Sequence, residues 1–273
     1  MSQLLTSIGY SPCPNDTFIF SGLAQGKVPL HHIRFAPPQL EDVETLNSWA
    51  MQRQGRLDVT KLSFHALGHV SDLYTLLESG AALGRGCGPL LVTARAQGDP
   101  AHWRIAIPGQ YTTAALLLRL FLPKHRQTVV MRFDQIMNAV ALGQVDAGVI
   151  IHESRFTYKE RGLFCVQDLG VWWEQETDLP LPLGCIAART SLGLEVIQEI
   201  EQAIVESIHW ASTHREECLT YIRQHAQEMD AQVLASHINL YVNEFSLQLG
   251  EEGRAAVQEL LRRGRKAGVF AHA

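Results

Sequence analysis

The sequence predicts an α/β protein made of two related halves followed by a helical region. Short apolar segments alternate with segments of helical apolar spacing through most of the chain, which is the pattern of βα units. Residues 55–59 resemble residues 143–147, and both sets follow a predicted helix and open a predicted strand. Residues 8–18 and 105–115 repeat a strand, a turn and a helix start. These echoes indicate two α/β halves whose strand ends face each other.

Length and composition narrow the class of protein. The chain has 273 residues, of which 46% are hydrophobic and 19% charged, with a net charge of −5. Without a basic run, nucleic acid is not an expected partner. No apolar stretch is long enough to cross a bilayer, and the first ten residues lack the pattern of a signal peptide. The five cysteines show no Cys-x-x-Cys spacing. We therefore expect reduced thiols in a cytoplasmic protein that does not bind membranes, and a homo-oligomer remains open.

The first half begins with a strand and a proline-rich turn. The two prolines of residues 11–17 exclude a helix before Asn15, and Asn15, Asp16 or Thr17 can cap the helix that follows. Glycines after residues 25 and 54 stop two helices. The predicted strands are residues 4–10, 29–38 and 57–61, and the predicted helices are residues 18–25, 41–54 and 66–77.

The second half begins after a glycine-rich segment, residues 84–89, where we expect backbones to pass closely or bend. Asp134 is the predicted cap of a helix, and residues 163–173 read as irregular. The predicted strands are residues 104–107, 129–133, 145–151 and 185–188, and residues 179–184 are extended. The predicted helices are residues 114–121, one that follows Asp134, 195–215, 216–227, 231–242 and 251–263.

The strand at residues 145–151 stops at His152 and Glu153. In open α/β sheets the carboxyl ends of strands face the ligand crevice. A histidine placed there can transfer protons near neutral pH. The alternative is a strand-end histidine that makes a structural hydrogen bond. Because side chains alternate along a strand, Glu153 should point to the opposite face from His152.

Two turns that precede helices can bind an anion. The free backbone N–H groups and the helix dipole after residues 111–113 suit a carboxylate or a phosphate. Thr112 can also simply cap this helix, and both interpretations can hold. Residues 11–17, with Asn15 and Asp16, offer the same chemistry from the other half. The glycines at 84–88 are not a phosphate loop, because the Lys-Ser/Thr ending is missing.

Three further patterns admit functional interpretations with simpler alternatives. His65 and His69 have a spacing that could hold zinc on a helix, but no third ligand is evident, so we expect no metal. Cys13 lies near a helix start that could lower its thiol pKa, but it lacks an evident catalytic partner. Trp172 and Trp173 could wall an aromatic ligand, although core packing is the commoner fate of tryptophan.

Several motifs together resemble one enzyme family. They are Ser-Pro-Cys-Pro-Asn-Asp-Thr-Phe (11–18), Asp-Val-Thr-Lys-Leu-Ser-Phe (58–64), Gly-x-Gly-Cys-Gly-Pro-Leu (84–90), the His152 stretch and Leu-Pro-Leu-Gly (181–184). In this order they resemble the 1,4-dihydroxy-6-naphthoate synthases of the futalosine route to menaquinone. Such enzymes convert cyclic dehypoxanthine futalosine to 1,4-dihydroxy-6-naphthoate without a cofactor.

The resemblance implies a two-lobed, type II periplasmic-binding-protein-like fold with the ligand cleft between the lobes. Residues 1–90 and 186–273 would form the first lobe and residues 93–184 the second, with crossings near Leu90 and Cys185. The family's proposed base maps onto His152. Contacts to an aromatic carboxylate and to hydroxyl groups of a small-molecule substrate would fall on Asn47, Ser63, Thr112 and Thr113. A chorismate dehydratase of the same pathway and a non-catalytic carboxylate-binding protein of the same fold remain as alternatives.

Overall fold

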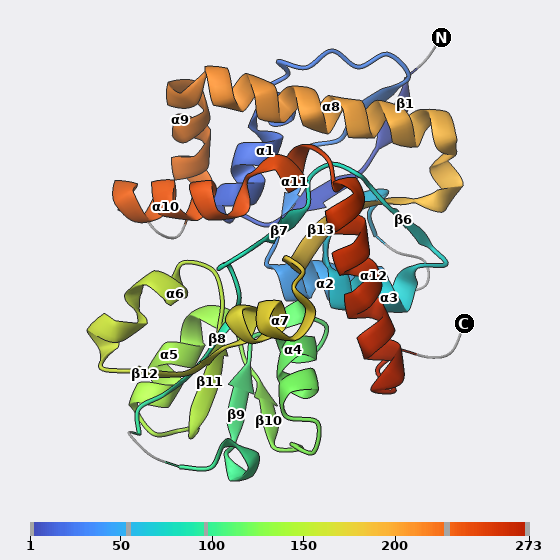
Figure 1. Ribbon diagram of the computed structural model, residues 1–273. Helices are drawn as coiled ribbons and strands as arrows, with labels where there is room; N and C mark the ends of the chain where they lie inside the picture. Colours follow the sequence, from blue (N-terminus) through green and yellow to red (C-terminus); the bar gives the residue numbers. More distant parts are fainter. Residues whose placement is uncertain (1–2, 53–55, 96–97, 227–229, 271–273) are drawn as a thin grey trace.

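The computed structural model describes residues 3–52, 56–95, 98–226 and 230–270. Its strands form two large, separate sheets and one small pair, β1 (Leu4–Thr6) with β3 (Ile33–Phe35). The two large sheets lie one above the other, with helices around each (Figure 1). We keep the boundaries of the two lobes, residues 1–90 with 186–273 and residues 93–184, as a prediction.

The first large sheet has the order β4-β2-β5-β13-β6, with β7 also paired to β13. Strands β2, β4 and β5 are parallel, whereas β13 runs antiparallel to its neighbours. Its strands are β4 (Gln39–Leu40), β2 (Ile8–Tyr10), β5 (Val59–Ser63), β13 (Leu181–Arg189), β6 (Tyr74–Leu76) and β7 (Ala82–Gly84).

The second large sheet has the order β10-β9-β11-β8-β12. Strands β9, β10 and β11 are parallel, and β8 is antiparallel to β11 and β12. Its strands are β10 (Thr128–Val130), β9 (Ile105–Ile107), β11 (Ala147–Ile150), β8 (Leu90–Thr93) and β12 (Phe164–Asp168). Strands β9 and β11 carry buried apolar residues on both faces, as expected of strands covered by helices, whereas the edge strand β10 is largely exposed.

Helices cover both sheets and form the C-terminal region. Helix α8 buries the predicted stripe, including Ile200, Ile204 and Ile208, and packs with α9 and α10 against α1. The helices are α1 (Pro14–Ala24), α2 (Val43–Met51), α3 (Phe64–Val70), α4 (Thr113–Phe121), α5 (Phe133–Ala141), α6 (Ser154–Thr157), α7 (Leu169–Thr177), α8 (Leu194–Thr213), α9 (Arg215–His225), α10 (Ala231–Tyr241), α11 (Glu244–Leu247) and α12 (Gly250–Lys266). In the described residues, no helix is long and apolar enough to span a membrane.

The chain crosses between the sheets twice, and the crossings touch through glycines. A Cβ atom on Gly88 would lie 2.2 Å from the backbone nitrogen of Gly170. The backbone N–H of Leu169 donates to Pro89 O at 3.0 Å, and the Arg155 guanidinium donates to Gly88 O. The predicted close approach of backbones at residues 84–89 is therefore confirmed, since only glycines permit this contact.

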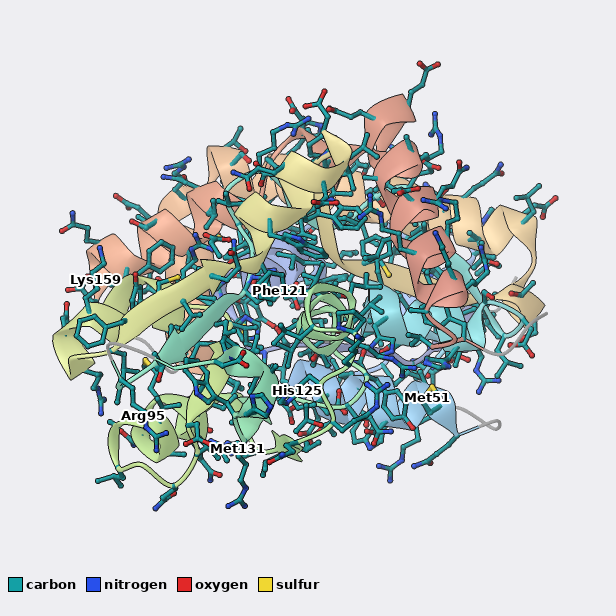
Figure 2. The ribbon with its side chains drawn as sticks, turned by 60° about the horizontal axis from the view of Figure 1, so that its bottom comes forward. Met51, Arg95, Phe121, His125, Met131 and Lys159 are labelled. Carbon is teal, nitrogen blue, oxygen red and sulfur yellow. The ribbon has the colours of Figure 1, made fainter. Side chains whose placement is uncertain are left out.

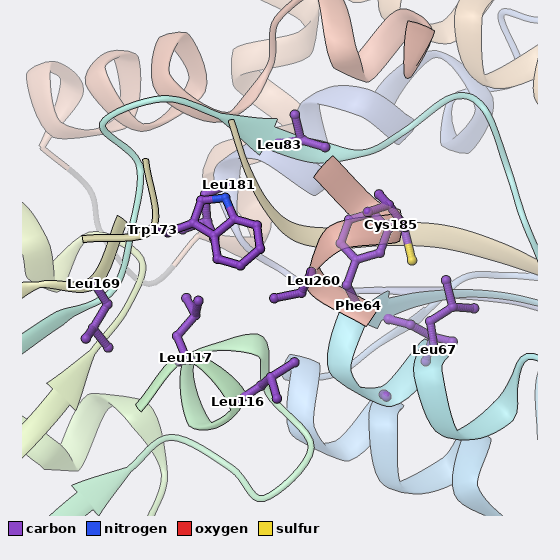
Figure 3. Close-up of a cluster of buried hydrophobic side chains, with 14 of the residues drawn as sticks. Phe64, Leu67, Leu83, Leu116, Leu117, Leu169, Trp173, Leu181, Cys185 and Leu260 are labelled. Carbon is purple, nitrogen blue, oxygen red and sulfur yellow. The ribbon is translucent and has the colours of Figure 1, made fainter. Parts of the chain in front are cut away.

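One hydrophobic core joins the two sheets beside these crossings (Figure 3). This core contains Phe64 of α3, which packs beside the first sheet, together with Leu117 of α4 and Trp173 of α7. Trp173 is fully buried, and its ring N–H donates to Pro180 O at 3.1 Å. The neighbouring Trp172 packs edge-on against Phe121. The tryptophans therefore serve packing rather than ligand binding.

Several local predictions are wrong. Residues 66–77 are not one helix, because α3 ends at Val70 and Tyr74 pairs with β13 while its hydroxyl donates to Leu57 O. Residues 163–173 are not irregular, since they form β12 and the start of α7, which Asp168 caps. Pairing with distant strands overrides local preference in both places.

Two predicted helix starts also shift. Arg132, not Asp134, is the N-cap of α5, so Asp134 lies in the first turn. Helix α1 starts at Pro14 with Cys13 as its cap, rather than at residue 18 after a cap at Asn15, Asp16 or Thr17, because proline lacks only an N–H that the first turn leaves unpaired. Gly55, the predicted stop of α2 and the start of the first echo, lies outside the described residues.

Candidate functional site

A cavity lies between the two sheets, and its empty space, part of which is open to solvent, amounts to about 640 Å³. Its walls come from α1, β5, α4, β13, α10 and the segment after β11. All predicted site residues except Asn47 line it. They are Asn15, Asp16, Ser63, Thr112, Thr113 and His152.

Asn47 lies behind the cavity wall and holds Ser63. Its side chain is fully buried on α2. The Asn47 amide oxygen accepts from the Ser63 backbone N–H at 2.9 Å, and its amide nitrogen donates to Ser63 Oγ at 3.1 Å. Because Ser63 Oγ already accepts this bond, its own hydrogen remains available to a ligand. Asn47 thus orients a cavity hydroxyl and does not contact the cavity itself.

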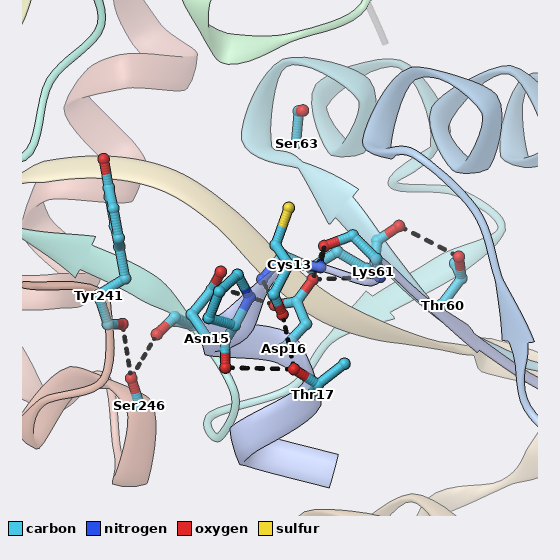
Figure 4. A network of polar contacts seen from close by, with 12 residues as sticks. Cys13, Asn15, Asp16, Thr17, Thr60, Lys61, Ser63, Tyr241 and Ser246 are labelled. Atoms are coloured by element: carbon cyan, nitrogen blue, oxygen red, sulfur yellow. Dashed lines mark hydrogen bonds and ion pairs between the residues drawn. The ribbon is translucent and has the colours of Figure 1, made fainter. Parts of the chain in front are cut away.

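A buried ion pair forms one wall of the cavity (Figure 4). The Lys61 ammonium lies 2.5 Å from Asp16 Oδ1, and both side chains are almost fully buried. Asp16 also accepts from Ser11 Oγ at 2.7 Å, from the Ser11 N–H at 3.2 Å and from the Asn15 amide nitrogen at 2.8 Å. The charge on this wall is therefore paired and saturated with hydrogen bonds.

His152 lines the cavity at the point where the chain leaves β11. The strand ends at Ile150, and His152 has a φ of 57°, which is uncommon for a residue with a side chain. Its Nδ1 lies 3.6 Å from Cys13 Sγ, and its ring packs edge-on against Phe133. Burial lowers the pKa of His152, while the nearby carboxylates of Glu153 and Asp16 oppose this shift. The imidazole is therefore neutral near pH 7.

Glu153 does not occupy the strand position that side-chain alternation predicts. It has helical backbone angles at the start of α6, so the two-residue period of a strand no longer applies. Together with His152 and Cys13 it lines a second hollow that adjoins the first. One carboxylate oxygen of Glu153 is buried and has no hydrogen-bond partner among the described residues. The expectation that Glu153 faces away from His152 is wrong.

The start of α4 offers backbone donors to the cavity. Thr112 caps the helix, since its Oγ1 accepts from the Ala115 N–H at 3.2 Å and donates to Gly109 O at 3.0 Å. The Thr113 hydroxyl donates to Leu183 O on β13 at 2.6 Å. Both hydroxyls are therefore engaged. The N–H groups of Thr113 and Ala114, at the first two helix positions, have no acceptor in the helix and lie at the positive end of its dipole.

Glu44 of α2 connects the first sheet's side to the turn before α4. Its carboxylate accepts from the backbone N–H groups of Gln110 at 2.6 Å and of Tyr111 at 3.1 Å. Burial raises the pKa of Glu44, while these hydrogen bonds oppose the shift. The hydrogen bonds to Glu44 and the bond from Thr113 to Leu183 both hold the start of α4 against elements that pack with the first sheet.

Lys61, His237 and Tyr241 are among the cavity residues that sequence reasoning missed. A lysine inside the buried strand β5 was the available signal for the first, because a buried charge needs a partner. His237 and Tyr241 come from α10, which no motif connects to the site. Only the folded chain brings His237 Nε2 to 3.0 Å from Asn15 Oδ1.

The remaining sequence candidates do not form a second catalytic centre. Burial raises the pKa of the Cys13 thiol, so the sulfur keeps its proton near neutral pH. His65 Nδ1 donates to Thr112 O at 3.0 Å, and burial lowers its pKa to about 4. With His69 it lines a hollow on another face, to which Met51 and His125, labelled in Figure 2, also belong. Within the described residues, no three His, Cys, Asp or Glu side chains are placed to hold a metal ion.

Comparison with protein families gives one match across almost the whole chain. Residues 6–266 match a family model described as menaquinone biosynthesis. A Thermus thermophilus protein named 1,4-dihydroxy-6-naphthoate synthase is 49% identical over 97% of this chain and 95% of its own. A Streptomyces coelicolor protein of the same name is 44% identical over 98% of this chain and 96% of its own.

Solved structures share the fold. A crystal structure of a protein from Archaeoglobus fulgidus superposes with a TM-score of 0.91 at 35% identity, covering 97% of this chain and 98% of that one. The alkanesulfonate-binding protein SsuA from Xanthomonas axonopodis, bound to MOPS, has a TM-score of 0.70 at 14% identity, covering 100% of this chain and 96% of that one. The predicted periplasmic-binding-protein-like fold is confirmed.

Proposed function

The chain belongs to the menaquinone biosynthesis family and is an enzyme. We propose that it converts cyclic dehypoxanthine futalosine to 1,4-dihydroxy-6-naphthoate, with His152 as the general base. The observation that carries the proposal is a neutral imidazole, held just after β11, in the wall of a cavity that both sheets line. The names of the two curated relatives favour this reaction over the dehydration of chorismate.

The environment of His152 suits proton abstraction. Nδ1 faces the Cys13 sulfur, which leaves Nε2 for the substrate. Desolvation keeps the ring unprotonated before the reaction, and the carboxylates of Glu153 and Asp16 favour the imidazolium that forms when it accepts a proton. His152 takes a proton from the cyclic ketone-alcohol, and the electron pair left behind drives cleavage of a carbon–carbon bond with release of the sugar-derived fragment. The imidazolium returns its proton to that fragment, and aromatisation of the naphthoate supplies driving force.

The start of α4 would hold the carboxylate of the substrate. The N–H groups of Thr113 and Ala114 and the hydroxyl of Ser63 are donors that line the cavity. A carboxylate that leaves water needs such donors, and the helix dipole adds to the attraction. Thr112 and Thr113 would therefore act through their backbone positions, because their hydroxyls are engaged elsewhere.

The test is turnover by the purified protein and by His152→Asn. With cyclic dehypoxanthine futalosine, the wild-type protein should release 1,4-dihydroxy-6-naphthoate, whereas chorismate should remain unchanged. His152→Asn should fold and bind substrate with similar affinity but lose turnover by at least about a hundredfold, the lower end of general-base catalysis. Near-normal turnover by this variant would show that His152 is a structural residue.

A further inference from the structure

His237 of α10 lines the cavity, and proton abstraction by His152 gives it no role. Its side chain is only 1% exposed. Its ring lies within 21° of parallel to that of His152, with 6.2 Å between the ring centroids, and also packs against Tyr241. A substrate group held by His237 would therefore lie beside the proposed base.

A chain of hydrogen bonds determines which nitrogen of His237 carries a proton. Asp16 accepts from the Lys61 ammonium, so it is a carboxylate with no proton to donate. The Asn15 amide nitrogen donates to it at 2.8 Å, which turns the amide oxygen of Asn15 toward His237. This oxygen lies 3.0 Å from His237 Nε2. Because an amide oxygen only accepts, Nε2 must be the protonated nitrogen.

The other ring nitrogen is consequently a bare acceptor. Burial lowers the pKa of His237 to about 3, with His152 and Lys61 as further causes, so the ring is neutral near pH 7. Nδ1 is buried and has no hydrogen-bond partner in the described residues. A buried acceptor without a donor is destabilising. Because His237 lines the cavity, a donor on a ligand bound there would supply the missing partner.

We propose that His237 Nδ1 accepts a hydrogen bond from a hydroxyl group on the sugar-derived part of the substrate, and that Lys61, Asp16 and Asn15 hold the ring in the required tautomer. The inference rests on the proposed function. His237 then recognises the substrate at a position beside His152. The two imidazoles have separate tasks, because a proton on His152 disfavours a second positive charge on His237.

Two matched substitutions distinguish the roles of the two ring nitrogens of His237. In His237→Gln the amide nitrogen can reach the Nε2 position and keep the bond to Asn15, but the acceptor at Nδ1 is lost. In His237→Asn the amide oxygen takes approximately the Nδ1 position. We expect His237→Gln to raise KM about tenfold, the effect of one lost hydrogen bond, with kcat within about threefold of wild type. His237→Asn should keep most of the affinity.

A substrate analogue that lacks the hydroxyl group on the sugar-derived part completes a double-change cycle with His237→Gln. Wild type should bind it about tenfold more weakly than the substrate, whereas His237→Gln should bind both alike. Equal KM values for His237→Gln and wild type, or equal defects in the Gln and Asn variants, would overturn the inference. Absence of wild-type turnover would instead overturn the proposed function.

Nitrogen NMR of histidine-labelled protein gives a readout that does not depend on activity. Near pH 7 the His237 ring should show a protonated Nε2 and an unprotonated Nδ1. The Nδ1 resonance should move when substrate is added to the turnover-deficient His152→Asn protein. A protonated Nδ1, or a resonance that does not respond to bound substrate because solvent already completes the acceptor, would contradict the proposal.

Discussion

The two walls of the cavity meet the same ligand space with opposite chemistry. On the first wall, which we call the charged wall, Asp16 is paired with Lys61 and accepts from the Asn15 amide, whose oxygen in turn meets His237. On the second, the amide wall, uncommitted N–H groups at the start of α4 lie with the neutral His152. Apart from His237 Nδ1, the polar groups of the charged wall hold one another, whereas the N–H groups of the amide wall are free for a ligand.

This contrast separates stability from catalysis. A buried ion pair contributes little net stability when intact, but removal of one partner leaves a desolvated charge and is strongly destabilising. A free helix terminus or a single neutral imidazole has no such buried partner to lose. Substitutions in the charged wall should therefore affect folding first, and those in the amide wall should affect binding or turnover first.

The largest expected effect on stability is that of Lys61→Met. It leaves the Asp16 carboxylate buried without its cation, which should reduce the free energy of unfolding by about 3–5 kcal/mol. Urea denaturation measures this. The double variant Lys61→Met/Asp16→Asn removes both charges and should recover part of the loss, whereas His152→Asn on the amide wall should stay within about 1 kcal/mol of wild type. A single variant as stable as the double one would contradict the difference between the walls.

Sequence reasoning predicted the amide wall better than the charged wall. The amide wall comes from two local signals, a capped helix after a turn and a histidine that ends an apolar strand. The charged wall depends on pairing between Lys61 and Asp16, 45 residues apart, and between Asn15 and His237, 222 apart. Periodicity carries no information about such pairs, because a partly apolar helix such as α10 looks alike wherever it packs.

The misplacement of Glu153 has a different cause. Side-chain alternation applies to Glu153 only if the strand continues through residue 153. The chain leaves β11 at Ile150, and the positive φ of His152 redirects the next side chain. A backbone conformation that is uncommon for histidine is not visible in composition or spacing, so a site at the exact end of a strand is where alternation fails.

The next effect concerns the pH dependence of stability. The folded-state pKa of His237 is about 3, below the value of about 6.5 in the unfolded chain. As the pH falls below about 6.5, the unfolded chain therefore binds a proton that the folded chain does not, and stability decreases. This histidine alone should account for about 2 kcal/mol between pH 7 and pH 5. Urea titrations at the two pH values measure the free energy of unfolding, and in His237→Gln its decrease from pH 7 to pH 5 should be smaller than in wild type by this amount. The same decrease in both proteins would mean that the ring is protonated in the folded protein.

A smaller effect is expected for Thr113, whose hydroxyl links the two walls through Leu183 O. Thr113→Val keeps the shape but loses this hydrogen bond, worth about 1 kcal/mol. Because the bond holds the start of α4 against β13, substrate binding should weaken by about fivefold while turnover of bound substrate changes little. Thr113→Ser keeps the hydroxyl and serves as the control. Titration calorimetry in the His152→Asn background gives the affinities, and equal values for the two variants would remove Thr113 from substrate binding.

The smallest effect should come from Cys13, the residue at which the two walls touch. Its sulfur lies 3.6 Å from His152 Nδ1, a weak contact that helps to direct Nε2 toward the substrate. Because burial raises the pKa of its thiol, Cys13 is a poor nucleophile near neutral pH. Cys13→Ala should therefore lower kcat by less than about tenfold, and Cys13→Ser, which can still pair with Nδ1, should lower it less. A loss in Cys13→Ala as large as that in His152→Asn would show instead that the sulfur takes part in bond breaking, and a covalent adduct detected by mass spectrometry after quenching would identify that step.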